Sequence, residues 1–288
     1  MELKIKELTK RYKSKTAFDG IDLTLSSGVY ALLGPNGAGK STLMNILVGL
    51  LGQTEGSVTL DGLEILSLGA KYRARLGFLP QYTGFYPTFS GEEMMRYFAV
   101  VKGIKNASQE IDELLEFVNL SEDKKRKCGE YSGGMKRRLG IAAALLGDPD
   151  ILIFDEPTAG LDPKERMRFR NILSRIGRGK LLLIATHIVS DVESITDNVI
   201  LLDGGKTILS GTLAEVISSA EGCVWELDCE DSFADEYALS HSGASVIKTA
   251  VGTRLHIVQS DKPFDDAVLT APTLEDVYML HFGQVSVQ

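Results

Sequence analysis

The sequence predicts an α/β fold, in which a mixed or parallel β-sheet packs against helices, with a helical subdomain and a small C-terminal α+β appendix. Short, continuous apolar runs, typical of strands buried on both faces, occur at residues 29–33, 76–79, 151–154 and 181–185. Segments with apolar residues at helical spacing separate these runs. After about residue 215 this alternation stops. We therefore expect domains at 1–218 and 219–288, with the helical subdomain at about 83–145.

The length and composition are those of an ordinary globular protein. With 288 residues, of which 44% are hydrophobic, the chain can bury one large core or one core plus a small appendage. No apolar run reaches the roughly eighteen residues of a membrane span, and residues 1–6 lack the apolar core of a signal peptide. Cys128, Cys223 and Cys229 show no CxxC spacing, which favours reduced thiols over a zinc site. We expect a cytoplasmic protein.

The net charge of −8 is unevenly distributed along the chain. Residues 211–288 contain 3 basic and 13 acidic residues, a net charge of −10, which leaves 28 basic and 26 acidic residues, a net charge of +2, before them. This acidity argues against nucleic acid as a partner. In the same part we expect strands at 223–228, 245–248 and 254–258 and a final helix capped by Thr273.

The segment GPNGAGKST at residues 34–42 directly follows the first apolar run. A strand that leads into a glycine-rich turn and then a helix directs backbone N–H groups into one concavity, and the helix start adds partial positive charge. Gly34, Gly39, Lys40 and Ser41 meet the pattern GxxxxGK[ST], in which lysine reaches the outer phosphates and the hydroxyl is placed to bind Mg²⁺. The remaining members of this phosphate cradle are Pro35, Asn36, Gly37, Ala38 and Thr42.

Two further observations bear on the phosphate cradle. The apolar residues that predict the following helix are Leu43, Ile46, Leu47, Leu50 and Leu51. The alternative interpretation is a glycine-rich turn with an exposed lysine, whereas the dinucleotide fingerprint GxGxxG is not met here.

Polar residues follow three of the other apolar runs. Gln81 follows the run at 76–79, Asp155 and Glu156 follow 151–154, and His187 follows 181–185. Because ligands of open α/β sheets bind beyond the carboxyl ends of the strands, these residues and Lys40 are expected to face one crevice. A solvated strand end is the alternative for the two acidic residues.

Phosphoryl transfer to water explains this set of residues. Such chemistry needs neutralised charge and a positioned water more than a covalent nucleophile. Asp155 and Ser41 are expected to bind Mg²⁺, and Gln81 to reach Mg²⁺ or the water. Glu156 is the predicted base that polarises the attacking water, and His187 is expected to hydrogen-bond the γ-phosphate.

A second helix start also has the features of an anion site. Ser132, Gly133 and Gly134, which we call the signature segment, precede a helix with an apolar face that includes Met135 and Leu139. The basic runs at 124–127 and 136–138 are expected to be solvated helix faces. A further helix begins after Asp162, with a predicted capping box at 162–165.

These motifs, in this order and spacing, resemble the ATP-binding subunit of an ABC transporter. The resemblance is carried by residues 34–42, 81, 132–134, 151–156, 159–162 and 187, and it covers about residues 2–215. It implies a P-loop NTPase core that binds ATP and Mg²⁺. It also implies a head-to-tail dimer with a second copy or a homologous subunit, in which each ATP lies between one phosphate cradle and the partner's signature segment. By the same resemblance, Tyr12 stacks on adenine and Asp162 belongs to the nucleotide-binding set.

The signature segment lies in the sequence YSGGM, where the family most often has LSGGQ. Methionine in the fifth position puts the usual polar contact there in doubt. Together with the C-terminal appendix, this variant is similar to the branch that serves multidrug, antibiotic and lipid exporters. The resemblance implies ATP hydrolysis that drives export through separate transmembrane permease subunits, with the chain at the cytoplasmic face of the membrane. Met94, Met95, Tyr97 and Phe98 either pack inside the helical subdomain or suit a groove in which a permease helix docks.

Three other functions fit the sequence less well than this one. A soluble ABC-type ATPase of DNA repair or translation would use the same site, but its long coiled-coil insertion or second cassette does not appear in this sequence. A P-loop small-molecule kinase would not need the signature segment or Glu156. A nucleotide sensor would not need both Glu156 and His187, which argue for turnover.

Overall fold

The computed structural model describes residues 1–13, 15–250 and 252–283. The chain divides into two compact units, Met1–Ile208 and Leu209–Gln288. The domain limits 1–218 and 219–288 remain a prediction, because a division into compact units does not define functional domains. Among the described residues, none of the helices combines the length and apolar character that crossing a lipid bilayer requires.

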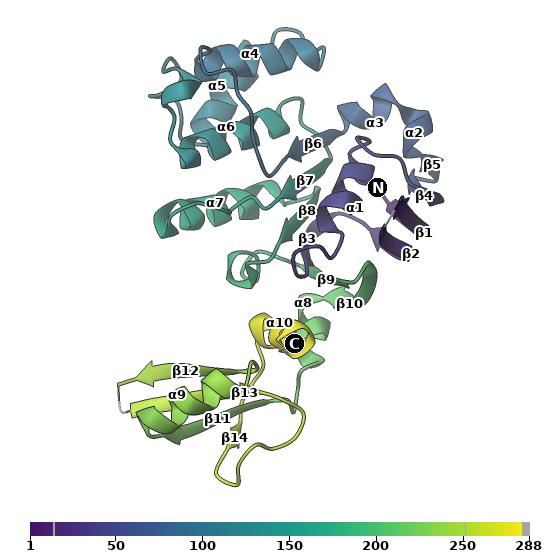
Figure 1. Cartoon of the computed structure of the whole chain (residues 1–288). Helices are drawn as coiled ribbons and strands as arrows, with labels where there is room; N and C mark the ends of the chain where they lie inside the picture. Colours follow the sequence, from purple (N-terminus) through teal and green to yellow (C-terminus); the bar gives the residue numbers. More distant parts are fainter. Residues whose placement is uncertain (14, 251, 284–288) are drawn as a thin grey trace. The chain divides into compact units, whose positions relative to one another are not determined.

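A six-stranded sheet with the order β10-β9-β3-β8-β7-β6 forms the centre of the first unit (Figure 1). Its strands are β3 (Gly28–Leu33), β6 (Leu76–Leu79), β7 (Ile151–Asp155), β8 (Leu181–Thr186), β9 (Asn198–Asp203) and β10 (Lys206–Thr212). The pairs β3–β8, β3–β9, β6–β7 and β7–β8 are parallel. All four apolar runs are therefore confirmed as strands, and their carboxyl ends meet at one edge of the sheet.

A second sheet, which the sequence analysis did not anticipate, has the order β2-β1-β4-β5 and is antiparallel. Its strands are β1 (Leu3–Tyr12), β2 (Lys15–Leu25), β4 (Glu55–Leu60) and β5 (Leu63–Glu64), and β5 leads into α2 (Ile65–Leu68) and α3 (Ala70–Ala74). The buried face of α1 (Lys40–Leu47) joins residues of both sheets in one apolar cluster. This packing fixes the helix that follows the phosphate cradle.

The predicted extent of α1 was too long. The helix ends at Leu47, and Leu50 lies outside it with 72% of its surface exposed. Gly49 explains the end, because its φ of +77° is left-handed and cannot continue a right-handed helix.

The segment expected to form the helical subdomain, at about 83–145, is mostly helical. It contains α4 (Gly91–Val101), α5 (Ser108–Phe117), the 3₁₀ turn η1 (Cys128–Glu130) and α6 (Gly133–Leu145). Ser90 and Glu93 form a full capping box at the start of α4. Met94 and Met95 are buried in the core, so the expectation that they line a groove is wrong. Their helical spacing points them to the side of α4 that packs inward.

The expectation of a solvated basic face on α6 is also wrong. Arg137 and Arg138 are only 6% and 8% exposed. Nη1 of Arg138 donates to the main-chain oxygens of Val118 and Asn119, at 3.1 and 2.6 Å. Main-chain carbonyls at element ends can thus stabilise a buried guanidinium, which a charge run in the sequence does not reveal.

The first unit is completed by α7 (Pro163–Ile176) and the 3₁₀ turn η2 (Val189–Asp191). Phe169, Ile172, Leu173 and Ile176 form the buried face of α7. This spacing of three and four residues is that of an amphipathic helix packed on one side.

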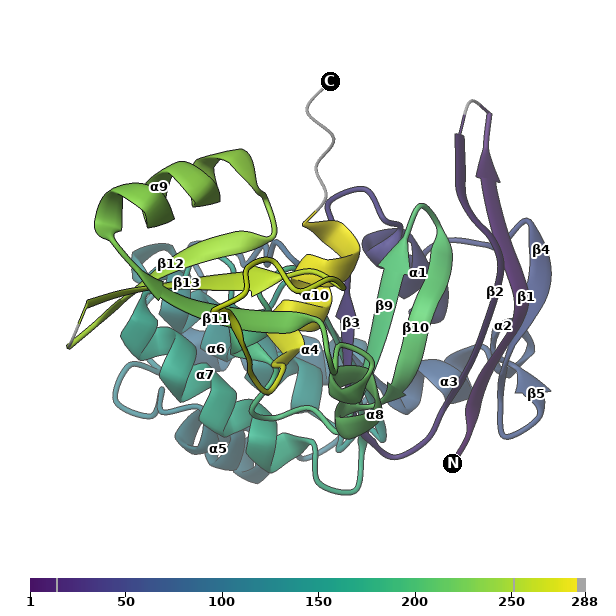
Figure 2. The same ribbon diagram turned by 90° about the horizontal axis from the view of Figure 1, so that it is seen from below.

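The second unit is an antiparallel sheet of order β12-β13-β11-β14 with α9 on one side (Figure 2). Its elements are α8 (Leu213–Ser218), β11 (Val224–Cys229), α9 (Asp231–Ser240), β12 (Ala244–Thr249), β13 (Gly252–Val258), β14 (Val268–Leu269) and α10 (Leu274–Phe282). The three predicted strands and the Thr273 cap are confirmed. No helix was predicted at the position of α9. It packs through Ala234 on Leu255 and Ile257.

Candidate functional site

The phosphate cradle connects β3 to α1. Gly39 occupies the N-cap of α1 with a left-handed φ of +105°. A Cβ on Gly34, whose φ is +156°, would lie 2.1 Å from the carbonyl oxygen of Leu202. Both positions therefore require glycine, and the backbone N–H groups of the first turn of α1 stay accessible to an anion.

A cavity of about 330 Å³ opens above this cradle. Its lining consists of Tyr12, Lys15, Ala17, Asn36, Gly37, Gly39, Lys40, Ser41, Thr42, Gln81 and Glu156. The structure thus brings Tyr12, the cradle, Gln81 and Glu156 together from four separate parts of the chain. The Tyr12 ring is 46% exposed, with Nζ of Lys10 5.3 Å from its centroid.

Lys40 is the buried cation of the cavity. Its Nζ donates to the carbonyl oxygens of Gly34 and Pro35, at 2.6 and 3.1 Å. Burial lowers the pKa of Lys40, while the charges of Glu156 and Asp155 act in the opposite direction. A buried cation whose partners are mostly dipoles favours the arrival of an anion such as phosphate.

Asp155, the last residue of β7, offers a free oxygen to a cation. Its carboxylate accepts a hydrogen bond from Ser41, and burial raises its pKa. Among the described residues, the buried atom Oδ1 of Asp155 has no hydrogen-bond partner. An orphaned carboxylate oxygen beside a hydroxyl fits the oxygen ligands that Mg²⁺ takes, so Asp155 and Ser41 fit the predicted role.

Glu156 is held by two groups from the end of β8. Its Oε1 lies 2.9 Å from Nδ1 of His187, and its Oε2 accepts from Oγ1 of Thr186 at 3.3 Å. The sequence analysis missed Thr186, although its place between the apolar run and His187 was the available signal. Glu156 is 6% exposed, so these contacts fix its carboxylate at the wall of the cavity.

The main chain at Glu156 is strained. Its φ is +46°, a left-handed value that is uncommon for a residue with a side chain. Its N–H donates to the carbonyl oxygen of Ala185 at 2.8 Å. Strain of this kind persists where the surroundings impose it, which is frequent at functional sites.

The predicted capping box at 162–165 is only half formed. Oδ1 of Asp162 accepts from the N–H of Glu165 at 2.9 Å, as expected of an N-cap. The Glu165 carboxylate instead pairs with Arg138, at 3.3 Å, and Arg168, at 2.7 Å. The box fails because two guanidinium groups compete for the acid, and a charged donor binds a carboxylate more strongly than an amide does.

The signature segment caps α6. Oγ of Ser132 accepts from the N–H of Met135 at 3.2 Å, and open space surrounds Gly133. A Cβ on Gly134 would lie 2.9 Å from Oε2 of Glu165. In the part of the chain that the structure describes, the three residues of the segment do not line the cavity over the phosphate cradle.

Comparison with known proteins agrees with this geometry. The sequence pattern described as ABC transporter matches residues 18–159. The chain is 38% identical to the Nod factor export ATP-binding protein I of Burkholderia lata over 224 residues, which is 76% of this chain and 73% of that protein. It belongs to the ABC transporter family. As a member of that family it is an ATP-binding subunit and an ATPase.

Other members of the ABC transporter family are similar to a comparable extent. The linearmycin resistance ATP-binding protein LnrL of Bacillus subtilis is 35% identical over 76% of this chain and 72% of its own length. A solved ATP-binding subunit of an ABC transporter superposes with a TM-score of 0.69 at 26% identity, over 76% of this chain and 93% of that one. A dimeric cassette in a post-hydrolysis state with ADP and inorganic phosphate gives 0.66 at 26% identity, over 73% and 98%.

Proposed function

We propose that this ATPase drives export, and that it binds each ATP between the phosphate cradle of one copy and the signature segment of a second copy or a homologous subunit. The observation that carries this proposal is the separation of the two anion sites. The cavity is lined from the cradle, Tyr12, Gln81 and Glu156, while Ser132 presents a helix start elsewhere. A head-to-tail pair gives both helix starts a phosphate to bind.

The side chains of the cavity divide the work of hydrolysis. The cradle and Lys40 bind the phosphates, and Tyr12 stacks on the base. Asp155 and Ser41 would hold Mg²⁺, which would neutralise phosphate charge when bound. Glu156 accepts a proton from the attacking water. Gln81 reaches the metal or that water.

His187 and Thr186 place the Glu156 carboxylate for this task. Nδ1 of His187 contacts one carboxylate oxygen, while the opposite edge of a half-exposed ring can reach a γ-phosphate. In the dimer, Asp162 belongs to the same nucleotide-binding set as the signature segment.

The export direction is supported by the name of one relative. The Burkholderia lata protein is named for Nod factor export, and the Bacillus subtilis protein is named for linearmycin resistance. We infer that the chain works at the cytoplasmic face of the membrane with transmembrane permease subunits. ATP closes the dimer, hydrolysis reopens it, and the permease converts this cycle into substrate movement.

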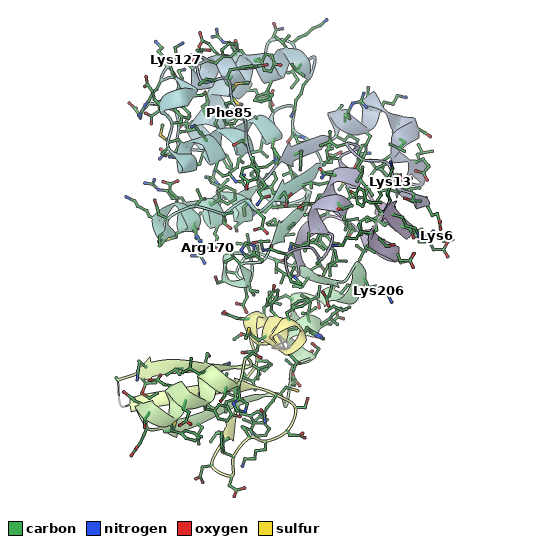
Figure 3. All side chains as sticks on the ribbon, viewed as in Figure 1. Lys6, Lys13, Phe85, Lys127, Arg170 and Lys206 are labelled. Carbon is green, nitrogen blue, oxygen red and sulfur yellow. The ribbon has the colours of Figure 1, made fainter. Side chains whose placement is uncertain are left out.

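An apolar groove supports a docking site for the permease. A cavity of about 370 Å³, the docking groove, is lined by Val48, Leu50, Arg73, Leu76, Phe78, Leu79, Pro80, Thr83, Gly84, Phe85, Phe98, Lys102, Gly140, Ala143 and Ala144. Phe85 is labelled in Figure 3. The lining includes Leu79 at the end of β6 and Pro80, which directly precedes Gln81. A partner helix in this groove could therefore act on the site through the segment that carries Gln81.

Glu156→Gln tests the proposed function. We expect kcat to fall at least about 100-fold, because the amide cannot accept the proton of water. The protein should then accumulate as an ATP-bound dimer, which light scattering with ATP and with ADP would detect. The matched control is Asp276→Asn, a buried acid of the second unit, which should leave kcat unchanged. Normal hydrolysis by the first variant would refute the base assignment, and a monomer that retains ATP would refute the shared site.

A further inference from the structure

Arg137 lies on α6, three residues after the signature segment, and its side chain reaches the ends of β6 and β7. Two glycines let α6 approach β6. A Cβ on Gly140 would lie 2.6 Å from Cδ1 of Leu79, and a Cβ on Gly77 would lie 2.3 Å from the carbonyl oxygen of Ala144. The helix is therefore close enough for the Arg137 side chain to reach the main chain at the ends of β6 and β7.

Each N–H of the Arg137 guanidinium meets a main-chain carbonyl. Nε donates to Pro157 at 2.8 Å. Nη1 donates to Pro80 and Gln81, each at 2.8 Å. Nη2 donates to Asp155 at 2.8 Å and to Glu156. An arginine has five N–H donors, so its donor capacity is fully used.

The five carbonyl groups belong to the two segments that carry the proposed catalytic residues. Pro80 and Gln81 follow the end of β6, and Asp155, Glu156 and Pro157 end or follow β7. The carbonyl of the left-handed residue, Glu156, accepts one of these bonds and lies between two other accepting residues. Arg137 thus fixes the strained main chain at Glu156 on one side, while the N–H of Glu156 is fixed by β8.

The charge of Arg137 suits this task. Burial lowers its pKa to about 10, although Asp155 and Glu156 attract the cation. The group therefore remains protonated at neutral pH, with carbonyl dipoles in place of water. Lysine could not replace it, because an ammonium has three donors on a flexible stem and lacks the planar fork that spans two segments.

We propose that Arg137 is a positioning residue that couples the helix of the signature segment to the main chain of Gln81 and Glu156. When the signature segment takes up a nucleotide held by the other subunit, α6 carries Arg137 with it, and both catalytic segments follow. This inference rests on the proposed function, because it assigns to Gln81 and Glu156 the roles given there. It adds a route by which binding at one ATP site adjusts the other site of the same chain.

Arg137→Lys and Arg137→Gln test the coupling in the full chain. We expect kcat to fall about 10- to 100-fold, because misplacement of catalytic groups by about 1 Å costs rate on this scale. The KM for ATP should stay within about twofold, since Tyr12 and the phosphate cradle have no contact with Arg137 among its hydrogen bonds in the described chain. A steady-state titration with MgATP separates the two parameters.

Arg138→Lys is the matched control. Arg138 is equally buried on the same helix, but its Nη1 donates to Val118 and Asn119 and its Nε pairs with Glu165 of α7, so none of these partners lies at the end of β6 or β7. The control should lower the unfolding midpoint as much as Arg137→Lys does, with kcat within about twofold of the wild type. Equal losses of kcat in the two lysine variants would overturn the proposal, because a general loosening of α6 would then explain both.

A double variant separates this inference from the proposed function. If Arg137 acts through Glu156, adding Arg137→Gln to Glu156→Gln should cost much less than the Arg137→Gln change costs alone. Fully multiplicative losses would overturn the positioning role. Wild-type kcat in Arg137→Gln, beside a large loss in Glu156→Gln, would overturn the inference and leave the proposed function intact.

Discussion

At the scale of single residues, the site depends on what holds Glu156. Its side chain is bound by Thr186 and His187, and the main chain around it by Ala185 and Arg137. Ala185, Thr186 and His187 are consecutive residues at the end of β8, and Arg137 belongs to α6. A base in a rotatable side chain needs such restraints to remain aimed at one water molecule.

Thr186→Val should lower kcat about 10- to 100-fold, because removing a hydrogen bond to a charged group costs roughly 1.5–3 kcal/mol. Valine keeps the shape of the buried side chain but loses the bond to Oε2 of Glu156 and the bond that the N–H of Ile188 donates to Oγ1 at 3.0 Å. ATP binding, measured by calorimetry, should be retained. Thr196→Val is the control, since Thr196 is also buried but bonds Val29 and Asn198 at the other end of β3. If Thr186→Val leaves kcat unchanged, Thr186 does not help to position Glu156.

At the scale of elements, helix ends organise both units. Ser90, Ser132, Asp162, Thr212 and Thr273 each cap a helix through a side-chain oxygen. Capping satisfies N–H groups that a helix leaves unpaired, typically with about 1 kcal/mol. In α10 the capping box has a second function, because its acid, Asp276, also binds His256 of β13 at 2.6 Å.

The His256–Asp276 pair makes the stability of the second unit depend on pH. The hydrogen bond to Asp276 raises the pKa of His256, burial acts against it, and Glu226 lies 3.9 Å from Nδ1. Burial acts to raise the pKa of Asp276, but the hydrogen bonds from His256 and Thr273 outweigh it and lower that pKa. Arg254, two residues away on β13, pairs with Glu226 at 2.8 Å.

The sign follows from linkage. Stabilisation by His256 is complete below its unfolded pKa of about 6.5 and is lost as pH rises through the higher folded value. Stabilisation by Asp276 is present above about pH 3.9 and is lost as pH falls through the lower folded value. We expect the second unit to lose about 1 kcal/mol on going from pH 6 to pH 9.

Trp225 reports this change, because it is the single tryptophan of the chain and lies in β11 of the second unit. Its fluorescence during thermal unfolding should show a lower midpoint at pH 9 than at pH 6. His256→Gln should remove the difference, and His241→Gln, an exposed histidine of the same unit, should preserve it. If the unfolding midpoint of His256→Gln still depends on pH, another titratable group causes the dependence.

At the scale of the whole molecule, the chain presents surfaces that are complete only with partners. The phosphate cradle and the signature segment are separate, and the docking groove carries exposed apolar side chains such as Leu50 at its lining. Tyr82, next to Gln81, is 85% exposed. A contiguous exposed apolar surface of sufficient size marks an interaction site.

Leu50→Asp should release the protein from its membrane partner. A buried carboxylate without a partner opposes docking by several kcal/mol, so the fraction that sediments with membranes should fall at least about tenfold. The unfolding midpoint should not change, because Leu50 is exposed in the single chain. Leu66→Asp is the control, an apolar residue of α2 that is 56% exposed and lies outside the groove. Equal sedimentation of wild type and Leu50→Asp would exclude this groove as the docking site.

The sequence by itself determined the parallel strands, the phosphate cradle and the polar residues after the strand ends. These features are local: a buried strand needs a continuous apolar run, and a phosphate turn needs glycine where Gly34 and Gly39 lie. The Thr273 cap is local as well, because its side chain accepts from the N–H of Asp276 in the first turn of the same helix. Periodicity within a short window therefore suffices to predict them.

Only the tertiary structure decided which polar side chains are buried and which residues, distant in the sequence, bind them. Arg137 and Arg138 read as a solvated basic run, and the fold buries both against carbonyl groups 18 to 57 residues away in the chain. Glu165 leaves its expected capping box for the same reason, because guanidinium groups brought by α6 and α7 bind it more strongly. Such partners come together only when the helices and strands pack, so a local sequence pattern cannot predict these contacts.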